Sequence, residues 1–550
     1  MKIWSLALVV VSCTALAQTP APKEALSVLE GRVVKDPGSL PVKKAEVTLI
    51  TEGDEERTTY SAITDVEGHF RIEGIRAGRY RAFVERTGMV EVGKRGHRSP
   101  GTALTFASGK DVTGIVLHLL PAAVVVGKVL DEDGDPMARV DVSVLRYGYV
   151  LGRRKTETAG SATTNDLGEY RVPDLLPGRY MVVVSPTPDF SQEALAPRQN
   201  ASTKQESCYV TTYYPGTTDR GQAASLDLRA GEETSVNFDL VRVPTYHVRG
   251  SVAGSLSLRS SELVIRGNEQ DTEFIAAQID KDGRFEISHL APGSYTLFVV
   301  GGNPDAPLIA QQSIEVTNAD LEDVRIVALG SSRVRGSVRV EGVRKVDQSS
   351  LLVFLQPSDR EQVSHFFAGS DLSVNPMLTK VKADGTFDLK DVPAGSYSVL
   401  IEGSARTPDV YLKAVKLGSV DISDSGFTVG GGGTYALEVL LASGAASLDG
   451  LVADGDNHAM TDVIVVAVPD GQHAARFDRY GKAITDQHGH FVMSGLTPGD
   501  YRVFAFESLE EGAYYDEAFL KPYEARGEKV HLDENGRKTL TLTVIPSAAD

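Results

Sequence analysis

The stretch that decides the fold is Gly168-Glu-Tyr-Arg-Val-Pro-Asp-Leu-Leu-Pro-Gly-Arg-Tyr180. Its skeleton, Gly-x-(Phe/Tyr)-x7-Gly-x-Tyr, occurs five times in the 550 residues with the same internal spacing. The final tyrosines stand at 80, 180, 295, 397 and 501, so the intervals are 100, 115, 102 and 104 residues. A repeat of this length predicts five modules of one fold. The copies are Gly68/Phe70/Gly78/Tyr80, Gly168/Tyr170/Gly178/Tyr180, Gly283/Phe285/Gly293/Tyr295, Gly385/Phe387/Gly395/Tyr397 and Gly489/Phe491/Gly499/Tyr501.

Each copy predicts two strands with turns beside them. Apolar residues two apart, such as Phe491 and Met493, put one face of each strand in a core. A Pro-Gly pair, as in Pro498-Gly499, favours a tight turn between the strands. We therefore expect a β-hairpin with one buried face in every copy. An aspartate precedes the first glycine and is expected to bond its own turn: Asp65, Asp166, Asp282, Asp384 and Asp486.

Further strands flank each copy. A Gly-x-Val or Gly-x-Leu opening strand lies upstream, as at Gly127-Lys-Val129, and an alternating closing strand lies downstream, as at Leu540/Leu542/Val544. No segment keeps a helical period. Short strands at this rhythm predict an all-β chain of small antiparallel sandwiches.

From Gly127 to Tyr180 the order of opening strand, Asp-Gly-Asp-Pro turn, alternating strand and Leu-Pro-Gly-x-Tyr resembles the carboxypeptidase regulatory-like domain. The resemblance implies a seven-stranded Greek-key β-sandwich of the transthyretin-like kind, in arrays like those of exported bacterial proteins. It does not imply peptidase activity. We expect five such sandwiches, at residues 27–122, 123–243, 244–331, 332–445 and 446–547.

The N-terminus predicts export. Lys2, the apolar run of residues 3–11 and the Ala15-Leu16-Ala17 site are typical of a signal peptide covering residues 1–17. We expect a secreted or periplasmic protein without a transmembrane segment; a lipid anchor at Cys13 is the minor alternative. The net charge of −18 argues against nucleic acid as a partner.

The sequence predicts no enzyme and no cofactor. Of the eleven histidines only His531 has a glutamate three residues later, Glu534, and no further histidine follows it in the chain. His-Glu-x-x-His, Gly-x-Ser-x-Gly and the phosphate-loop signature are absent as well. A triad assembled from distant residues is not excluded by sequence, because such groups meet only in space.

Four local features are candidates for a metal-binding, reactive or ligand-binding site. The alternating aspartates 131, 133 and 135 could hold calcium, although Pro136 and Val142 rule out an EF-hand and a solvated turn is the default. His488 and His490 could share a metal but fit an ordinary turn better. Cys208 lacks a histidine nearby in sequence and reads as an incidental thiol. The last feature is a set of loop tyrosines that could bind a ligand or pin their loops to their own sandwich: Tyr213, Tyr214, Tyr514 and Tyr515.

The leading functional prediction is a non-catalytic, exported interaction scaffold of the cell envelope or extracellular space, which binds an envelope or extracellular protein, or a polysaccharide, through loops at the sandwich ends. The alternative is a carbohydrate-binding protein that uses the loop tyrosines. Isopeptide cross-linking, known from similar sandwiches, needs a buried Lys, Asn and acid together. The closing strands contain no recurring Asn, so we do not expect such cross-links. Short linkers with Pro121 and Pro244 predict a semi-rigid rod of modules.

Overall fold

The structure is a computed structural model. It describes residues 25–52, 58–91, 99–150, 152–186, 206–254, 262–267, 275–300, 308–328, 330–342, 347–358, 377–402 and 409–546. The predicted signal peptide and Cys13 lie outside these residues. Within them, no helix combines the length and the apolar character needed to cross a membrane.

Nearly all regular elements are strands, which confirms the all-β class. Module 1 contains β1 (Ser27–Lys35), β2 (Leu40–Pro41), β3 (Glu46–Thr51), β4 (Thr59–Ile63), β5 (His69–Ile75), β6 (Gly78–Glu85), β7 (Met89–Glu91), β8 (Thr102–Phe106) and β9 (Val112–Pro121). Module 2 contains β10 (Ala123–Leu130), β11 (Asp141–Val150), β12 (Arg153–Thr163), β13 (Glu169–Leu175), β14 (Gly178–Ser185), β15 (Ser207–Tyr209), β16 (Thr212–Tyr213), η2 (Arg220–Gln222), β17 (Leu226–Leu228), β18 (Glu233–Ser235), β19 (Phe238–Asp239) and β20 (Arg242–Pro244).

The remaining modules repeat this arrangement. Module 3 contains β21 (Tyr246–Gly254), β22 (Glu262–Gly267), β23 (Ile275–Gln278), β24 (Arg284–Leu290), β25 (Gly293–Val300), β26 (Leu308–Val316) and β27 (Leu321–Ala328). Module 4 contains β28 (Ser332–Glu341), η4 (Gln348–Ser350), β29 (Leu352–Pro357), β30 (Leu378–Lys380), β31 (Thr386–Val392), β32 (Gly395–Glu402), β33 (Val410–Leu417), β34 (Val420–Asp421), β35 (Phe427–Val429) and β36 (Thr434–Ser443). Module 5 contains β37 (Ala446–Ala453), β38 (Ile464–Pro469), η7 (Gly471–Ala475), η8 (Phe477–Arg479), β39 (Gly481–Ile484), β40 (His490–Leu496), β41 (Gly499–Phe506), η9 (Ala513–Tyr515), α2 (Glu517–Leu520), η10 (Lys521–Arg526), β42 (Glu528–Leu532) and β43 (Arg537–Thr543).

Each module packs two main sheets against each other, and module 2 has an additional two-stranded sheet of β15 and β20. Module 3 shows the plan with seven strands, in the orders β24-β21-β27 and β23-β22-β25-β26. Its first and last strands, β21 and β27, pair in parallel, as do β1 with β9, β28 with β36 and β37 with β43. Each of these modules therefore contains one parallel pair within sheets that are otherwise antiparallel. Between these two strands the chain passes through the opposite sheet. The last strand then lies beside the first and runs in the same direction.

The repeated Gly-x-(Phe/Tyr)-x7-Gly-x-Tyr stretch is not a hairpin. In module 5 its first strand, β40, pairs with β37, whereas its second strand, β41, pairs with β38 and β42 in the other sheet. The Pro-Gly turn thus carries the chain from one sheet to the other. Phe491 and Tyr501 are both buried because they face the same core from opposite sides.

The glycine of each opening strand and the final tyrosine of each repeated stretch have packing roles. A side chain at Gly450 would place its Cβ 2.0 Å from the Leu540 carbonyl oxygen and 2.9 Å from the Phe491 ring, so only glycine fits there. The hydroxyl of Tyr501 donates to the carbonyl of Thr497, 2.7 Å away. The equivalent glycines and tyrosines of the other modules make the same contacts, the tyrosine always to the carbonyl four residues earlier.

The acidic turn before each copy is also repeated, with one difference. Asp65 and Asp486 accept hydrogen bonds from two backbone amides of their turns, as expected. In modules 2 and 3 the acceptor is instead Asn165 or Asp280, the first residue of the turn. The expected roles of Asp166 and Asp282 are therefore wrong by one and two positions, because the side chain must stand at the start of the turn to reach both amides.

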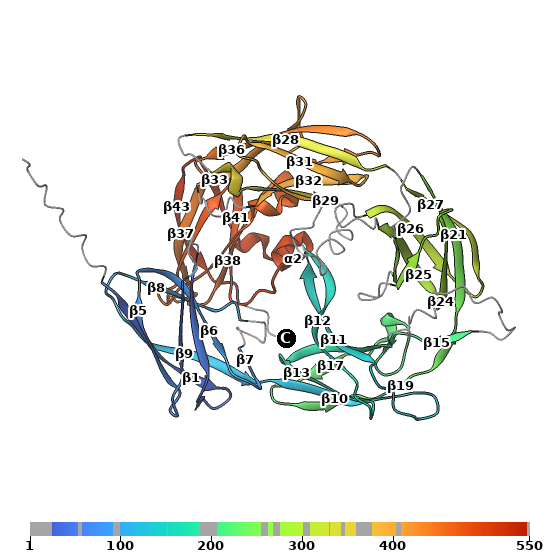
Figure 1. Cartoon of the computed structure of the whole chain (residues 1–550). Coiled ribbons are helices and arrows are strands. Elements are labelled where there is room, and N and C mark those ends of the chain that lie inside the picture. The colour runs from blue at the N-terminus through green and yellow to red at the C-terminus, as the bar shows by residue number, and fades with distance from the viewer. Residues whose placement is uncertain are drawn as a thin grey trace, which may run out of the picture.

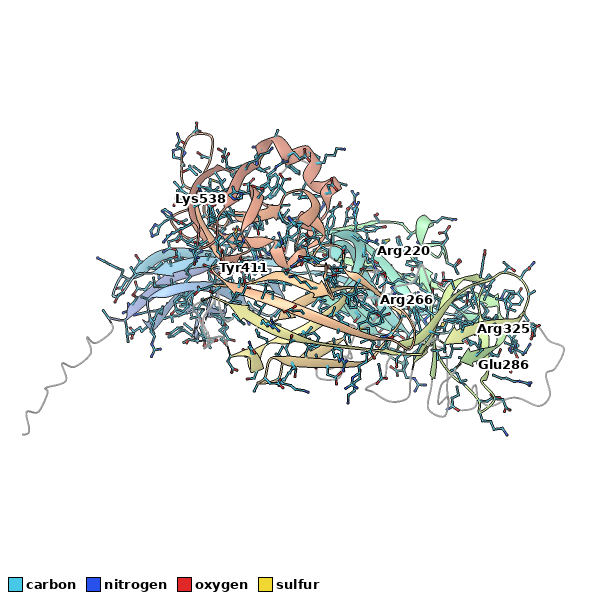
Figure 2. The ribbon with its side chains drawn as sticks, turned by 90° about the horizontal axis from the view of Figure 1, so that it is seen from above. Arg220, Arg266, Glu286, Arg325, Tyr411 and Lys538 are labelled. Atoms are coloured by element: carbon cyan, nitrogen blue, oxygen red, sulfur yellow. The ribbon has the colours of Figure 1, made fainter. Side chains whose placement is uncertain are left out.

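The five modules follow one another around a closed ring, and module 5 returns to module 1 (Figure 1). Seen from above, module 5, which carries Lys538, stands out from one face of this ring (Figure 2). The predicted rod is therefore wrong. Hydrogen bonds between residues 105 and 487, which are 382 positions apart, hold the ends together.

Candidate functional site

The most extensive feature that sets this chain apart from a simple string of modules is the contact that closes the ring. We call it the closure contact; it joins Thr105 of β8 and Arg79 of β6 in module 1 to the turn at residues 486–489 in module 5. The Gln487 side-chain carbonyl accepts from the Thr105 amide at 2.9 Å, and its amide nitrogen donates to the Thr105 carbonyl at 2.7 Å. Gln487 therefore occupies the place of a neighbouring strand at the edge of the sheet.

A buried carboxylate supports this contact. The Thr105 hydroxyl donates to Asp486 Oδ2 at 2.7 Å, and Arg79 lies 3.8 Å from the same oxygen. Arg79 also donates to the carbonyl of Ile484 at 3.1 Å. Burial alone would raise the pKa of Asp486, but hydrogen bonds from Thr105 and two backbone amides, together with the Arg79 charge, hold that pKa below its usual range.

The loop that carries two of the predicted tyrosines forms the second half of the closure contact. Residues 507–526 fold as η9, α2 and η10 over the outer face of the β38–β41 sheet. Tyr514 is 5% exposed and Tyr515 is half-buried. Ala103 of module 1 and Tyr149 of module 2 join the same apolar cluster. These tyrosines therefore pin the loop to its own sandwich, and they also hold two other modules.

The β11–β12 hairpin of module 2 reaches this cluster through close backbone contacts. A Cβ on Gly152 would lie 2.5 Å from the Tyr515 carbonyl oxygen, and one on Gly512 would lie 2.8 Å from that of Tyr149. The Tyr149 ring meets Phe519 edge-on, with centroids 6.0 Å apart. Burial raises the pKa of Tyr149, and nearby carboxylates add to the shift.

The other two predicted tyrosines pack within module 2, Tyr214 against its core and Tyr213 in a separate small cluster. Tyr213 is 3% exposed and packs with Leu145, Met181 and Val183. Tyr214 is half-buried, with its ring 6.3 Å from that of Phe238. The burial of Tyr213 and Tyr514 favours the second of the two predicted roles, in which the tyrosines pin their loops.

The calcium candidates form a turn. Asp131 Oδ1 accepts from the backbone amides of Asp133 and Asp135, at 3.0 and 2.8 Å, so this carboxylate is used within the turn. The three aspartates do not gather their carboxylates around a common point; among the described residues only Asp454, Asp456 and His458 do so. His488 and His490 are both exposed and likewise form no such group.

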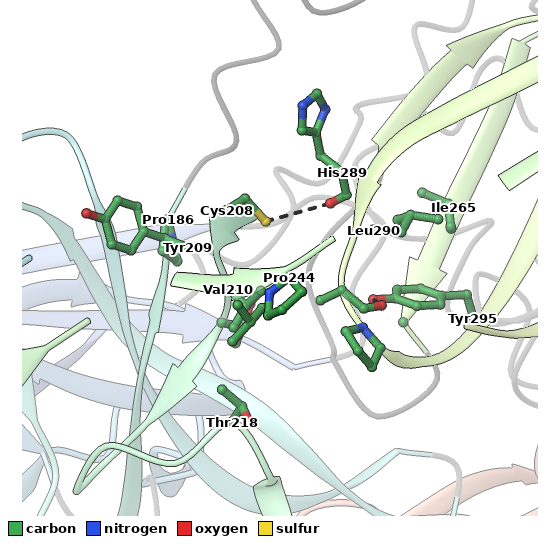
Figure 3. A pocket seen from close by; sticks show the side chains of 15 residues that line it. Pro186, Cys208, Tyr209, Val210, Thr218, Pro244, Ile265, His289, Leu290 and Tyr295 are labelled. Carbon is green, nitrogen blue, oxygen red and sulfur yellow. Dashed lines mark hydrogen bonds between the residues drawn. The ribbon is translucent and has the colours of Figure 1, made fainter. Parts of the chain in front are cut away.

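Cys208 lies at the joint between modules 2 and 3, beside a pocket of about 390 Å³ (Figure 3). Its thiol contacts the backbone carbonyl of His289 at 3.7 Å, and the His289 ring points away from the pocket in Figure 3. The structure thus brings a histidine near the cysteine, but through its backbone. Tyr209, Tyr295 and apolar side chains such as Leu290 line the rest of the pocket.

Comparison with protein families decides the nature of the first two modules. Residues 28–111 and 124–241 match the model of the carboxypeptidase regulatory-like domain. Modules 1 and 2 are carboxypeptidase regulatory-like domains. The two matched ranges end directly before β9 and β20, and modules 3 to 5 share the strand plan of modules 1 and 2. A comparison with curated proteins found no match.

Solved structures similar to this chain include Gram-positive pilins. A streptococcal ancillary pilin is 12% identical over 55% of this chain and 99% of its own, with a TM-score of 0.19. GBS52, the minor pilin of Streptococcus agalactiae, is 12% identical over 40% of this chain and 97% of its own, with a TM-score of 0.21. The Bacillus anthracis TIE protein is 13% identical over 78% and 76%, with a TM-score of 0.16. Scores this low carry no argument about assembly or function.

Sequence reasoning missed the closure contact between the regulatory-like domains and module 5. Thr105, Gln487 and Arg79 are common surface residues, and nothing in their spacing marks them. One signal was available for the loop, since residues 507–528 combine four aromatic side chains with many acidic ones outside the repeated pattern. Such an insertion often serves a contact outside its own module.

Proposed function

We propose that the protein is a non-catalytic, exported interaction scaffold that holds the end loops of five sandwiches in fixed relative positions. The closure contact is the observation that carries this proposal, because it joins modules 1, 2 and 5 through buried polar and apolar groups. A string of independent modules would not need it. The family of modules 1 and 2 supports a binding role instead of a catalytic one.

Exposed apolar residues at one repeated turn indicate where a protein partner binds. Val66 in module 1 is 78% exposed and Leu167 in module 2 is 56% exposed, each in the turn before β5 or β13. The equivalent turn of module 5 carries Gln487, which already binds another module. This turn therefore contacts another module in one copy and faces solvent in two others.

The test replaces Val66 or Leu167 with a photo-crosslinking amino acid and illuminates the chain with envelope material of its source cells. We expect discrete protein adducts that excess unlabelled chain suppresses. The control places the crosslinker at Val327, which is 58% exposed on strand β27, outside the repeated turn. Equal labelling at all three positions would contradict binding through these turns.

The carbohydrate alternative is tested in parallel with a glycan and envelope-polysaccharide panel. The burial of Tyr213 and Tyr514 leaves these two side chains little surface with which to contact a sugar. Saturable glycan binding, together with no protein adducts, would favour this alternative over the scaffold.

A further inference from the structure

We propose that strand β26 of module 3 (Leu308–Val316) binds an extended segment of a partner protein as an added β-strand. β26 ends the sheet β23-β22-β25-β26, so β25 is its only strand neighbour among the described residues of that sheet. The free side of such a strand presents a row of backbone N–H and C=O groups. Extended peptides bind to rows of this kind by β-augmentation. This inference names a second binding surface, and it rests on the proposed function only in requiring a protein partner.

The same strand position is already occupied in module 1. There β8 follows β6 in its sheet as β26 follows β25 in module 3, and both strands stand at the end of their sheets. Gln487 of module 5 bonds to the amide and the carbonyl of Thr105 in β8. This edge therefore accepts backbone-like donors and acceptors from another part of the protein. In module 3, no described strand pairs with the outer side of β26.

Matched positions on β8 and β26 show the difference between a covered and an uncovered edge. Leu104 and Ile314 both stand opposite the final tyrosine of the repeat in their module. Leu104 is 1% exposed, whereas Ile314 is only half-buried against the core of module 3. Ala310 in the same core-facing row is also half-buried, and Gln312 between them is exposed. The core of module 3 is thus open along β26, and an added strand would cover it.

β26 also lacks the residues that commonly keep an edge strand unpaired. Proteins protect such edges with lysine, proline, inward-pointing charges or bulges. The edge strand β12 of module 2 begins with three basic residues, at 153–155. β26 contains no basic residue and no proline, and its one charged residue is Glu315. Its register shift lies at the start of the strand, so residues 310–316 pair regularly with β25.

These features define the chemistry of the partner segment. One face of the added strand would pack on Ala310 and Ile314, so its residues on that face are apolar. The other face would lie beside the exposed side chains of Gln311, Ser313 and Glu315, so it is polar. A basic residue close to Glu315 stabilises the pairing, whereas an acidic one opposes it. The partner segment is therefore extended, alternating and basic on its polar face.

The test selects binders of the purified full chain from random phage-displayed peptides of about ten residues, the length of a long strand. We expect enriched peptides with alternating apolar residues and a Lys or Arg. A synthetic copy of an enriched peptide should slow hydrogen exchange at residues 310–315. Gln312→Lys places a charge in the core-facing row and should abolish binding. The matched control, Ser161→Lys, adds the same charge at an exposed position of β12 and should leave binding unchanged.

A charge reversal tests the register of the partner. Glu315→Lys should weaken binding of the enriched peptide and strengthen binding of a peptide whose basic residue is replaced by Glu. Thermal unfolding shows whether each variant folds; because the Glu315 side chain is exposed, this variant tests the proposal even if Gln312→Lys does not fold. Retained binding in a folded Gln312→Lys chain, protection outside β26, or no enriched peptide would overturn the proposal.

Two further outcomes separate this surface from its alternatives. Crosslinked adducts at Val66 and Leu167, without any peptide on β26, would overturn the edge-strand site and leave the proposed function intact. Peptide binding at β26 without those adducts would do the reverse for binding through the turns. Sedimentation equilibrium tests pairing between copies of the chain. A mass that rises with concentration, and does not rise in Gln312→Lys, would make a second copy the occupant of the edge and overturn the proposed partner.

Discussion

At the scale of single residues, the glycine of each opening strand is fixed by its neighbours. Gly450→Ala should lower the free energy of unfolding of module 5 by about 3 kcal/mol or more, because its Cβ would overlap the Leu540 carbonyl in a packed core. Gly455→Ala is the control, since nothing lies within 4 Å of a Cβ there. Urea unfolding of the two variants measures the difference. Equal effects would show that the close approach does not explain the glycine.

A second residue-scale prediction concerns Tyr514. Tyr514→Ala should cost about 3–5 kcal/mol of module 5 stability, as truncation of other buried aromatic side chains does, because this ring is 5% exposed within the apolar cluster of the closure contact. Tyr147→Ala, at a position 47% exposed, should change stability little. Differential scanning calorimetry distinguishes them. A Tyr514→Ala chain as stable as the parent that had lost glycan binding would restore the carbohydrate interpretation.

Sequence reasoning succeeded or failed at this scale for a physical reason. Alternation identified Phe491, Met493 and Tyr501 as core residues, and all three are buried. It could not identify the partner of each strand, because both sheets of a sandwich bury the same kind of face. The expected hairpin at Pro498-Gly499 is a crossing between sheets for that reason.

At the scale of elements, the β11–β12 hairpin of module 2 depends on Gly152 for its approach to module 5. Gly152→Ala should separate the hairpin from η9, because a Cβ there would lie 2.5 Å from the Tyr515 carbonyl oxygen. Gly134→Ala is the matched control: both glycines have positive φ, 74° and 83°, but only Gly152 has a close neighbour. Hydrogen exchange should increase around residues 513–520 only in Gly152→Ala.

Loops of this kind explain why the sequence left the role of the candidate tyrosines open. Tyr514 and Tyr515 stand in an acidic, aromatic loop that sequence alone describes equally well as exposed or as packed. The surface that covers them comes from other modules, through Ala103 and Tyr149. Contacts between residues so far apart leave no local pattern to detect.

At the scale of the whole molecule, ring closure should depend on pH. Because the folded pKa of Asp486 lies below its usual range, this carboxylate contributes stability at and above neutral pH. The contribution should disappear as pH falls from about 4, where the unfolded group titrates, through the lower folded value. Small-angle scattering should show a ring at pH 7 and a more extended particle near pH 3. Asp486→Asn should reduce that dependence.

Gln487→Ala tests the same closure at neutral pH. The change removes both hydrogen bonds to the Thr105 backbone, at 2.9 and 2.7 Å, and should raise the exchange rate of the Thr105 amide. Gln222→Ala, in a turn of module 2 where the amide donates to Asp219, is the control. Unchanged exchange at Thr105 would mean that the ring stays closed through the apolar cluster alone.

The position of Gln487 also determines how late in synthesis the ring can close. A ribosome adds about 5–20 residues per second, so the 382 residues between Thr105 and Gln487 take roughly 20–80 s. For that time module 1 is complete but its β8 edge has no partner from module 5. An open strand edge recruits other strands, so the nascent chain has a period of vulnerability to aggregation that ends only when its last module folds. Truncation before module 5 should make that period permanent.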